Sequence, residues 1–563
     1  MPDTPTPSAP ETPAPASPPP ATPPAHQTAD NQEEAAGFYC LAEQPWIPAH
    51  TQGALTGYGL RGLLLDAHRL DRLALPVPPA ESALLRLLTA VTARISGLDD
   101  PDMPTEQWHD TRRSLLAQGR FDEHAVNSYL DQWTWELFHP TRPFLQDPAL
   151  ARQCTKTSGV NKLVFGRPAG NNLAWLSVHT DTRPQPVPAA QAAWHLLLWH
   201  YYGPSGTCSS RTVGATTAGQ LRAGPLRGAL SFHPQGRTLF ETLLLSQTPY
   251  RGLGQSEEDL CPWEEAGPPD PLRPPAEITW PGRLLTARSR HALLLVADPD
   301  RRHAVDAYVT WATLERPLPA TDPFVITLTD PTKEADRRDT VRRADRHRGA
   351  WRDLDALLLA GDETTGVRRP EVFTDLNEWP PDLTAHVTVT VHGFDQDPKT
   401  RDHLWYSGHT PAIWTWAQEH NPDLALRISE CRQAAEVLGA HLIRAANRAW
   451  RESTRPSAAD GTHHADSAHP GEDRGRTPSA WARDSTARYW PRAESLFWDL
   501  VRHRPQEAAF PAFAAEAARC LRATLTPLLH HYRGAGPALA RAVRALHAAG
   551  AAPAPPVAPQ EPQ

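Results

Sequence analysis

The chain has 563 residues, a formal net charge of -8, a pI near 6.4 and a mean hydropathy of -0.50. This length allows two or three domains, each with its own core. The acidic balance argues against a protein that coats nucleic acid non-specifically, because such binding draws most of its energy from a strongly basic face. Since no apolar run reaches about 18 residues, a membrane span is excluded and we expect a soluble, cytoplasmic protein.

The two ends of the chain and its cysteines carry simple signals. Residues 1–36 are rich in Pro, Ala, Thr and Ser, and they lack the basic-then-apolar pattern of a signal sequence. Such a composition cannot bury enough apolar area to offset ordering entropy, so we expect a disordered tail there and a second one at 550–563. The six cysteines form no CxxC pair, which indicates reduced thiols rather than a zinc ribbon or a disulfide framework.

A mixed domain of helices and short strands is predicted from residue 37 to residue 405. Apolar residues recur at helical spacing in several segments, whereas others are short and β-branched. We expect an extended segment at 38–48, helices at 81–95, 125–138, 191–202 and 238–245, and strands at 226–232, 292–297, 304–311 and 387–391. The sheet of this domain is therefore assembled from segments that lie far apart in the sequence.

Lysine is rare in this chain, which has four lysines and more than fifty arginines. Two of the four, Lys156 and Lys162, lie in a segment that also contains Asn161, Asn171 and Asn172. Flexible ammonium groups suit phosphate contacts that are made and released, and amides can meet base edges or sugars. The segment is therefore interpreted as a contact loop, with a solvated surface loop as the alternative.

Residues 333–348 mix basic and acidic side chains. Their spacing permits pairing between positions i and i+4 on a helix, so we expect a charged helix. A solvated helix face and a phosphate-facing patch are both compatible with this pattern.

The character changes to long helices in the region 406–549. Helical apolar patterns at 423–451, 485–502, 507–525 and 538–549 predict a four-helix bundle, with a polar loop at about 454–480. The predicted fold is therefore α+β, with a mixed N-terminal domain followed by this bundle.

Several enzyme signatures are missing from the sequence. It contains no GxxxxGK[ST] loop, no GxSxG elbow and no HExxH, so we predict no catalytic residues, no metal site and no cofactor. His109-Asp110 is an HD dipeptide, but metal phosphohydrolases need further ligands from other helices. His463-His464 with His469 could bind a metal adventitiously.

The order of these pieces resembles the CasA family, the large subunit of the type I-E Cascade CRISPR surveillance complex. The likeness spans nearly all of residues 38–550. It is carried by FYCLAEQPWIP, ALLRLLTAVTARI, YLDQWTWELFHPTRPFLQDP, VNKLVFGRPAGNN, RTLFETLLLSQTP, FDQDPKTRDHLWYSGHTPAIW and ARYWPRAESLFW.

The resemblance implies a non-catalytic protein that recognises the protospacer-adjacent motif of double-stranded DNA through the minor groove. It also implies that a glutamine-bearing hairpin starts unwinding of the duplex so that the guide RNA can pair. The implied partners are the target DNA, the backbone subunits that carry the crRNA, and the nuclease-helicase that is recruited.

The family's DNA-binding roles can be placed on three segments of this sequence. Val160, Asn161 and Lys162 match the loop that contacts the motif region. The turn at Gly203 and Gly206 corresponds to the family's glycine loop, and Gln396 matches the wedge glutamine, with Lys399 in the same turn.

One family role and two other function classes stay open. The family's motif-contacting lysine is expected near residues 301–311, where only Arg301 or Arg302 could replace it. The competing hypotheses are a metal-dependent nucleic-acid hydrolase and a helical protein-interaction scaffold.

Overall fold

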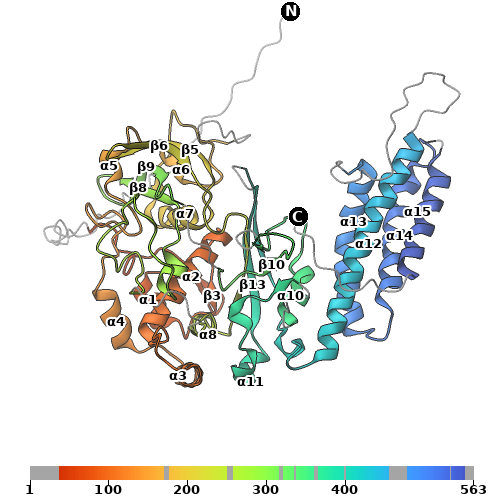
Figure 1. The fold of residues 1–563 in the computed structure, drawn as a ribbon, viewed down its shortest axis with the longest axis horizontal. Coiled ribbons are helices and arrows are strands. Elements are labelled where there is room, and N and C mark those ends of the chain that lie inside the picture. The colour runs from red at the N-terminus through yellow and green to blue at the C-terminus, as the bar shows by residue number, and fades with distance from the viewer. Residues whose placement is uncertain are drawn as a thin grey trace, which may run out of the picture. The chain divides into compact units, whose positions relative to one another are not determined.

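The structure is a computed structural model that describes residues 37–169, 177–249, 258–315, 321–334, 338–359, 366–397, 401–454, 478–532 and 534–551. The chain divides into the units Met1–Gly37 and Phe38–Gln563, and the fold described below is that of the second unit. This unit combines helices with antiparallel sheets, so the predicted α+β class is confirmed (Figure 1). The predicted tail at 1–36 and most of the one at 550–563 lie outside the described residues.

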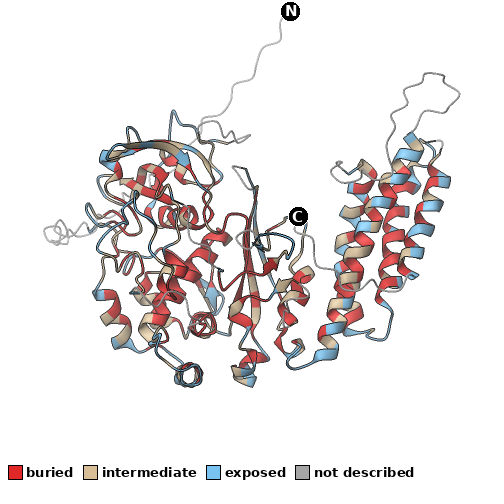
Figure 2. Ribbon diagram, viewed as in Figure 1, coloured by how far each residue is buried: buried red, intermediate tan, exposed pale blue. Residues whose placement is uncertain are grey.

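Helix α2 (Pro78–Ser96) lies at the centre of the N-terminal core, where residues 81–95 predicted a buried helix. It packs against α7 (Ala189–Tyr202), α8 (Leu239–Leu245) and α9 (Gly282–Thr286), and its middle is buried on all sides (Figure 2). The Arg86 guanidinium on α2 is fully buried and pairs with Asp322 at 2.7 Å. A buried arginine of this kind needs a carboxylate partner, which here comes from a segment more than two hundred residues away.

Short strands and helices precede and follow α2 in the sequence, between residues 47 and 163. Strand β1 is the middle strand of an antiparallel sheet with the order β2-β1-β3. These elements are β1 (Ile47–Thr51), β2 (Ala54–Tyr58), α1 (Leu60–Asp66), β3 (Arg72–Leu73), α3 (Thr105–Gln118), α4 (Glu123–Asp131), α5 (Leu150–Gln153) and α6 (Val160–Leu163).

The helix predicted at 125–138 is too long, because α4 ends at Asp131. Beyond that residue the Trp135 indole donates a hydrogen bond to the carbonyl of Leu130, and its ring packs against the rings of Phe144 and Trp263. The ring contacts with Phe144 and Trp263, which lie outside the helix, hold Trp135 in the core. The aromatic spacing that imitated a helix therefore reflects a long-range aromatic cluster.

The strands join distant segments, as predicted. The sheet β14-β13-β7 brings Leu230–Gln235 (β7) beside Thr388–Gln396 (β13), and β14 (Asp402–His409) completes a hairpin with β13. The other sheets have the orders β4-β9-β8, β11-β10-β12 and β5-β6. Their strands are β4 (Val187–Pro188), β5 (Gly206–Val213), β6 (Thr216–Leu221), β8 (His291–Ala297), β9 (His303–Trp311), β10 (Thr327–Thr329), β11 (Asp339–Val341) and β12 (Val367–Arg368).

The charged helix predicted at 333–348 is wrong. The described part of this segment contains strand β11 and turns, and its arginines pair with residues elsewhere in the chain. Arg342 and Arg348 both contact the buried carboxylate of Asp353, at 3.1 and 2.9 Å. Because the acidic partners lie outside the segment, pairing between positions i and i+4 does not organise it.

Short helices connect the sheets to the C-terminal region. They are η1 (Ala350–Asp353), α10 (Leu354–Leu358), η2 (Glu371–Phe373), η3 (Leu376–Glu378), α11 (Pro381–Thr384) and η4 (Trp414–Trp416). Helix α10 packs against the first long C-terminal helix, α12 (Pro422–Thr454). Glu436 on α12 accepts hydrogen bonds from Arg352 at 2.6 Å and Arg348 at 2.9 Å, so ion pairs fix this junction.

Four long helices form the C-terminal bundle. Helices α12, α13 (Ala480–Arg502), α14 (Ala509–Leu525) and α15 (Ala535–Ala551) lie side by side, with η5 (Thr526–Leu528) after α14 (Figure 1). Their buried faces point toward one another and their exposed faces point outward (Figure 2). The predicted four-helix bundle is therefore confirmed. The domain boundary between residues 405 and 406 stays a prediction, and most of the predicted polar loop lies outside the described residues.

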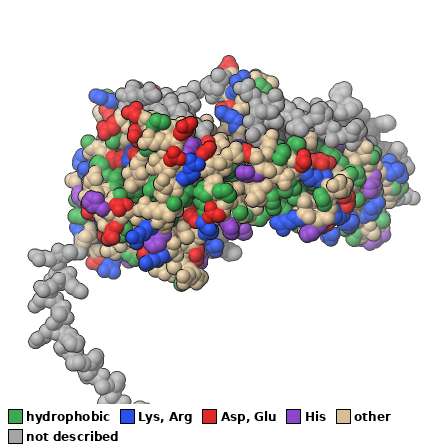
Figure 3. All heavy atoms as spheres, turned by 90° about the horizontal axis from the view of Figure 1, so that it is seen from below, with side chains coloured by type: hydrophobic (Ala, Val, Ile, Leu, Met, Phe, Trp, Pro, Cys, Tyr) green, Lys and Arg blue, Asp and Glu red, His purple; other side chains and the backbone are tan. Residues whose placement is uncertain are grey.

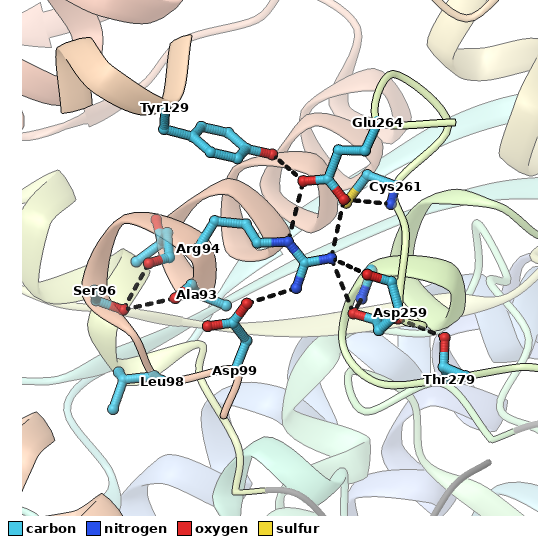
Figure 4. A network of polar contacts seen from close by, with 12 residues as sticks. Ala93, Arg94, Ser96, Leu98, Asp99, Tyr129, Asp259, Cys261, Glu264 and Thr279 are labelled. Atoms are coloured by element: carbon cyan, nitrogen blue, oxygen red, sulfur yellow. Dashed lines mark hydrogen bonds and ion pairs between the residues drawn. The ribbon is translucent and has the colours of Figure 1, made fainter. Parts of the chain in front are cut away.

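A polar network fixes the end of α2 to the segment after residue 258. Figure 4 shows the Arg94 guanidinium between Glu264, Asp99 and Asp259, with ion pairs of 3.0, 2.6 and 3.1 Å. The Tyr129 hydroxyl donates a further 2.6 Å hydrogen bond to Glu264. Because one arginine satisfies three carboxylates from two segments, the network holds the loop segment on the helix.

Candidate functional site

Helix α6 contains the first predicted contact residues. Val160 and Asn161 are each 1% exposed, so both side chains are buried. The Asn161 Nδ2 group donates a hydrogen bond to Asp181 at 3.0 Å, and Arg167 donates to the Asn161 Oδ1 atom at 3.5 Å. In this conformation the Asn161 amide braces the loop that follows α6. A direct contact between Asn161 and DNA stays a prediction, and it requires this loop to move.

Lys162 is more accessible than its two neighbours on α6. Its ammonium lies 5.6 Å from the ring centroid of Trp199, in a cation–π contact. Partial burial lowers the pKa of Lys162, and the Asp402 carboxylate opposes this shift. Lys162 is therefore a cation that an aromatic ring holds in place, and the negative charge of Asp402 favours its protonated form.

The turn after α7 contains the two predicted glycines. A Cβ atom on Gly203 would lie 2.6 Å from the His291 ring, so close packing requires glycine there. Gly206 has a φ of 134°, a left-handed backbone conformation that glycine adopts without strain, and it begins strand β5. Both glycines therefore have structural reasons of their own, and a contact between this turn and DNA stays a prediction.

Gln396 is the last residue of β13 rather than part of the turn that follows. Its side chain is 4% exposed and forms three hydrogen bonds. The Nε2 group donates to Asp402 at 2.7 Å and to the Tyr202 carbonyl at 3.3 Å, and the Oε1 atom accepts from the Gly228 amide at 3.2 Å. The hairpin predicted to carry the wedge glutamine is present, but the Gln396 side chain is buried and braces the two strands beside the turn. Lys399 lies outside the described residues.

Arg227 holds the two strands of this hairpin together and was not singled out from the sequence. Its guanidinium is 3.0 Å from the Asp402 carboxylate and donates to the carbonyls of Tyr202, Asp397 and Arg401, at 3.1, 3.1 and 3.2 Å. Burial lowers the pKa of Arg227, and Asp402 acts in the opposite direction. The only local signal was an arginine between glycines, which indicates no particular partner.

Asp402 therefore lies where the three predicted segments meet. Helix α6 contributes Lys162, which lies over the Trp199 ring of α7, the end of α7 contributes the Tyr202 carbonyl, and the β13–β14 hairpin contributes Gln396 and Asp402 itself. Arg227 completes the group. We call these five residues the Asp402 cluster, and it combines a partly exposed cation with a rigidly held hairpin.

The other candidate residues from the sequence lie elsewhere. Arg301 and Arg302 lie between β8 and β9, and the Arg301 guanidinium stands 4.1 Å from the centroid of the Phe38 ring. His109 is 7% exposed, and its Nε2 atom is 3.9 Å from Asp375. Within the described ranges, no group of three or more His, Cys, Asp or Glu side chains could hold a metal ion.

Three further observations concern the surface charge, the cysteines and the length of the helices. Acidic and basic side chains are interspersed over the face seen in Figure 3. All six cysteines have free thiols, as expected. Among the helices that the structure describes, none is long and apolar enough to cross a membrane.

Comparisons with known proteins give a consistent family. The model of the family "CRISPR-associated protein Cse1" matches residues 41–529. The CRISPR-associated protein CasA/Cse1 of Thermus thermophilus is 30% identical over 333 residues, which are 56% of this chain and 60% of that protein. The match thus spans about three fifths of the length of this relative.

Solved structures extend the similarity over most of the chain. A chain of a CRISPR RNA-guided surveillance complex is 36% identical, with a TM-score of 0.79, and the match covers 91% of this chain and 99% of that one. The crystal structure of Thermobifida fusca Cse1 is 20% identical, with a TM-score of 0.63 and coverages of 91% and 97%, which indicates a shared fold. The resemblance read from the sequence is confirmed, and the chain belongs to the CRISPR-associated protein Cse1 family.

Proposed function

We propose that this chain is the large subunit of a cytoplasmic type I-E CRISPR surveillance complex. In this role it recognises a protospacer-adjacent motif in double-stranded DNA, starts unwinding of the duplex and recruits the nuclease-helicase, without catalysing a reaction itself. The observation that carries the proposal is that α6, the end of α7 and the β13–β14 hairpin are neighbours: the Trp199 indole donates to the Leu163 carbonyl at 2.9 Å, and Gln396 donates to the Tyr202 carbonyl at 3.3 Å. The similarity to a chain of a CRISPR RNA-guided surveillance complex supports it.

The chemistry of the Asp402 cluster suits reading of a minor groove. That groove presents mostly hydrogen-bond acceptors, so a lysine ammonium and closely approaching backbone give permissive discrimination. Lys162 supplies such a donor, and the turn at Gly203 and Gly206 supplies backbone without bulky side chains. Several related motifs should therefore be accepted.

The β13–β14 hairpin suits the start of unwinding. Arg227 and Gln396 anchor its turn end by several hydrogen bonds, so this end of the hairpin can press against DNA without folding back. Opening one base step costs about a few kcal/mol, which contacts on the protein can offset in part. Guide pairing then continues the strand exchange near balance. With a chain charge of -8, much of the target-strand capture falls to the guide RNA and basic partners.

The test uses the complex reconstituted from this chain, a guide RNA and the other subunits. The wild-type complex should capture a matched duplex only when the motif flanks it. Lys162→Ala should weaken this capture, whereas Lys156→Ala, which removes an exposed lysine six residues away, should not. Equal capture of every flanking sequence by the wild-type complex, or failure of the chain to join the RNA-containing assembly, would overturn the proposal.

A further inference from the structure

Strand β14 presents two large apolar side chains to solvent, Leu404 and Trp405. Their exposed fractions are 53% and 37%. Within the described residues β14 pairs with β13 alone, so it is an edge of the sheet β14-β13-β7. Successive side chains of a strand point to opposite faces. Leu404 and Trp405 therefore project from opposite faces of the same hairpin.

Trp405 lies on the face of the hairpin that carries Gln396, where a register shift on β14 places Asp402 instead of His403 opposite Gln396. Trp405 is directly opposite Phe394 on β13, and side chains of such a pair share one face. The Phe394 ring is 5.8 Å from that of Phe165, which is 5.2 Å from the Trp199 ring beneath Lys162. Gln396, two residues after Phe394, has the same orientation. A series of ring contacts thus runs from Phe394, the cross-strand neighbour of Trp405, to the Trp199 ring beneath Lys162.

Leu404 lies on the other face. It is opposite Asp395, whose carboxylate is 3.7 Å from the Arg346 guanidinium. Two residues further along, the Tyr406 hydroxyl donates a hydrogen bond to the Arg348 carbonyl. This face therefore contacts residues 346–348, and it is opposite the face that carries Gln396.

We propose that Trp405 stacks on a base of the first pair that opens beside the recognised motif. The proposal rests on the proposed function and changes the part that Gln396 plays in it. The Gln396 side chain is 4% exposed and occupied by three hydrogen bonds, whereas the Trp405 indole is on the surface. Gln396 holds the hairpin in place, and Trp405 meets the DNA.

The chemistry of an indole fits this place in the reaction. Stacking of a base on an aromatic ring is tolerant of sequence, because every base has a π-face. The first pair beyond the motif belongs to the target, whose sequence changes with each guide, so a tolerant contact is needed there. Lys162 on the same face supplies a positive charge for a neighbouring phosphate. A side chain that read base edges would restrict the targets.

The test compares four forms of the reconstituted complex: wild type, Trp405→Ala, Trp405→Phe and the opposite-face control Leu404→Ala. The affinity for a motif-bearing duplex is measured first. Trp405→Ala should weaken binding roughly five- to hundredfold, the range for loss of one base–aromatic stack. Trp405→Phe should restore most of this loss, and Leu404→Ala should stay within about twofold of wild type.

A second measurement detects the stack itself. A duplex whose first pair is mismatched and contains 2-aminopurine has an open, fluorescent base at this place. Wild type and Trp405→Phe should quench it, whereas Trp405→Ala should leave it bright. Wild-type affinity and quenching in Trp405→Ala overturn the stacking proposal.

Two other outcomes identify what has failed. If Trp405→Ala no longer joins the assembly while Leu404→Ala does, Trp405 contacts a protein subunit and the stacking proposal is wrong. If the wild-type complex captures duplexes regardless of the motif, the proposed function fails whatever the Trp405 variants do.

Discussion

The Gln396 amide donates a 2.7 Å hydrogen bond to the Asp402 carboxylate, which joins the end of β13 to the start of β14. The two residues close the hairpin at its turn end, since the intervening turn begins at residue 397. The Gln396 Oε1 atom also accepts a hydrogen bond from the Gly228 amide, so the hairpin is tied to the turn before β7 as well. Gln396 was expected to act as the wedge, but its side chain supports the hairpin instead.

Gln396→Ala should release the Gly228 amide. The substitution leaves the buried Gly228 amide without its partner, whereas Asp402 and the Tyr202 carbonyl keep Arg227, and the unpaired amide costs roughly 1–3 kcal/mol of local stability. Hydrogen exchange of a peptide that contains Gly228 should therefore quicken, whereas exchange in the C-terminal bundle should not change. Unchanged exchange at Gly228, together with a loss of DNA capture, would favour a direct DNA contact by Gln396 over the bracing role.

Arg227→Met should loosen the hairpin. The guanidinium donates to the carbonyls of both Asp397 and Arg401, so its loss removes contacts on both sides of the turn. Limited proteolysis should cut the region 397–401 faster in this variant. The matched control is Arg222→Met, which removes an exposed guanidinium bonded to the Leu314 carbonyl and should leave the cleavage rate unchanged. Equal cleavage of wild type and Arg227→Met would show that strand pairing alone holds the turn.

The sequence predicted elements whose stability comes from their own apolar face. The four bundle helices follow this pattern because burial of a periodic face decides their structure, whereas α2 and α7 are apolar enough to be buried on nearly all sides. The predictions were wrong at 125–138 and 333–348. In both places the deciding partners, such as Trp263 and Asp353, lie outside the segment.

In the candidate site, too, some features could be predicted from the local sequence and others depend on distant partners. Its three segments could be found from the sequence, because the family resemblance places a loop, a turn and a hairpin. The burial of Asn161 and Gln396 could not be predicted, since their partners Asp181 and Tyr202 are distant in the sequence. Arg227 was missed for the same reason: only the folded chain brings it to the hairpin.

Glu436→Gln should weaken the junction between α12 and the segment around η1. Glu436 accepts hydrogen bonds from Arg352 and Arg348, and its side chain is 26% exposed. Removing the charge leaves two arginines facing each other, at a cost of about 2 kcal/mol after allowance for solvent screening. Hydrogen exchange of residues 350–358 should quicken.

The control for Glu436 is Glu452→Gln on the same helix. Glu452 pairs with Arg541, whose side chain is 53% exposed, so this substitution should cost less than about 1 kcal/mol. If the two variants have the same effect on exchange, the Glu436 ion pairs do not stabilise the junction.

His291 should make the stability of the protein depend on pH. Its ring is 1% exposed and lies against Gly203, and one ring nitrogen is 3.1 Å from the Pro204 carbonyl. Burial lowers the pKa of His291 from 6.5 to about 3, opposed by the bond to Pro204 and assisted by His200, Arg290 and Arg227. The folded protein therefore holds this ring neutral in a range where the unfolded chain protonates it.

The sign of the effect follows from the lowered pKa. Above pH 6.5 the ring is neutral in both states, so its contribution to stability is fully present. As pH falls below 6.5, His291 becomes protonated in the unfolded state but stays neutral in the folded state. The free energy of unfolding therefore decreases by about 1.4 kcal/mol for each pH unit. His291→Gln keeps a donor for Pro204 but cannot titrate, so unfolding curves between pH 7 and pH 4 should show a shallower decline for the variant. Parallel curves for the two proteins would mean that His291 titrates alike in both states.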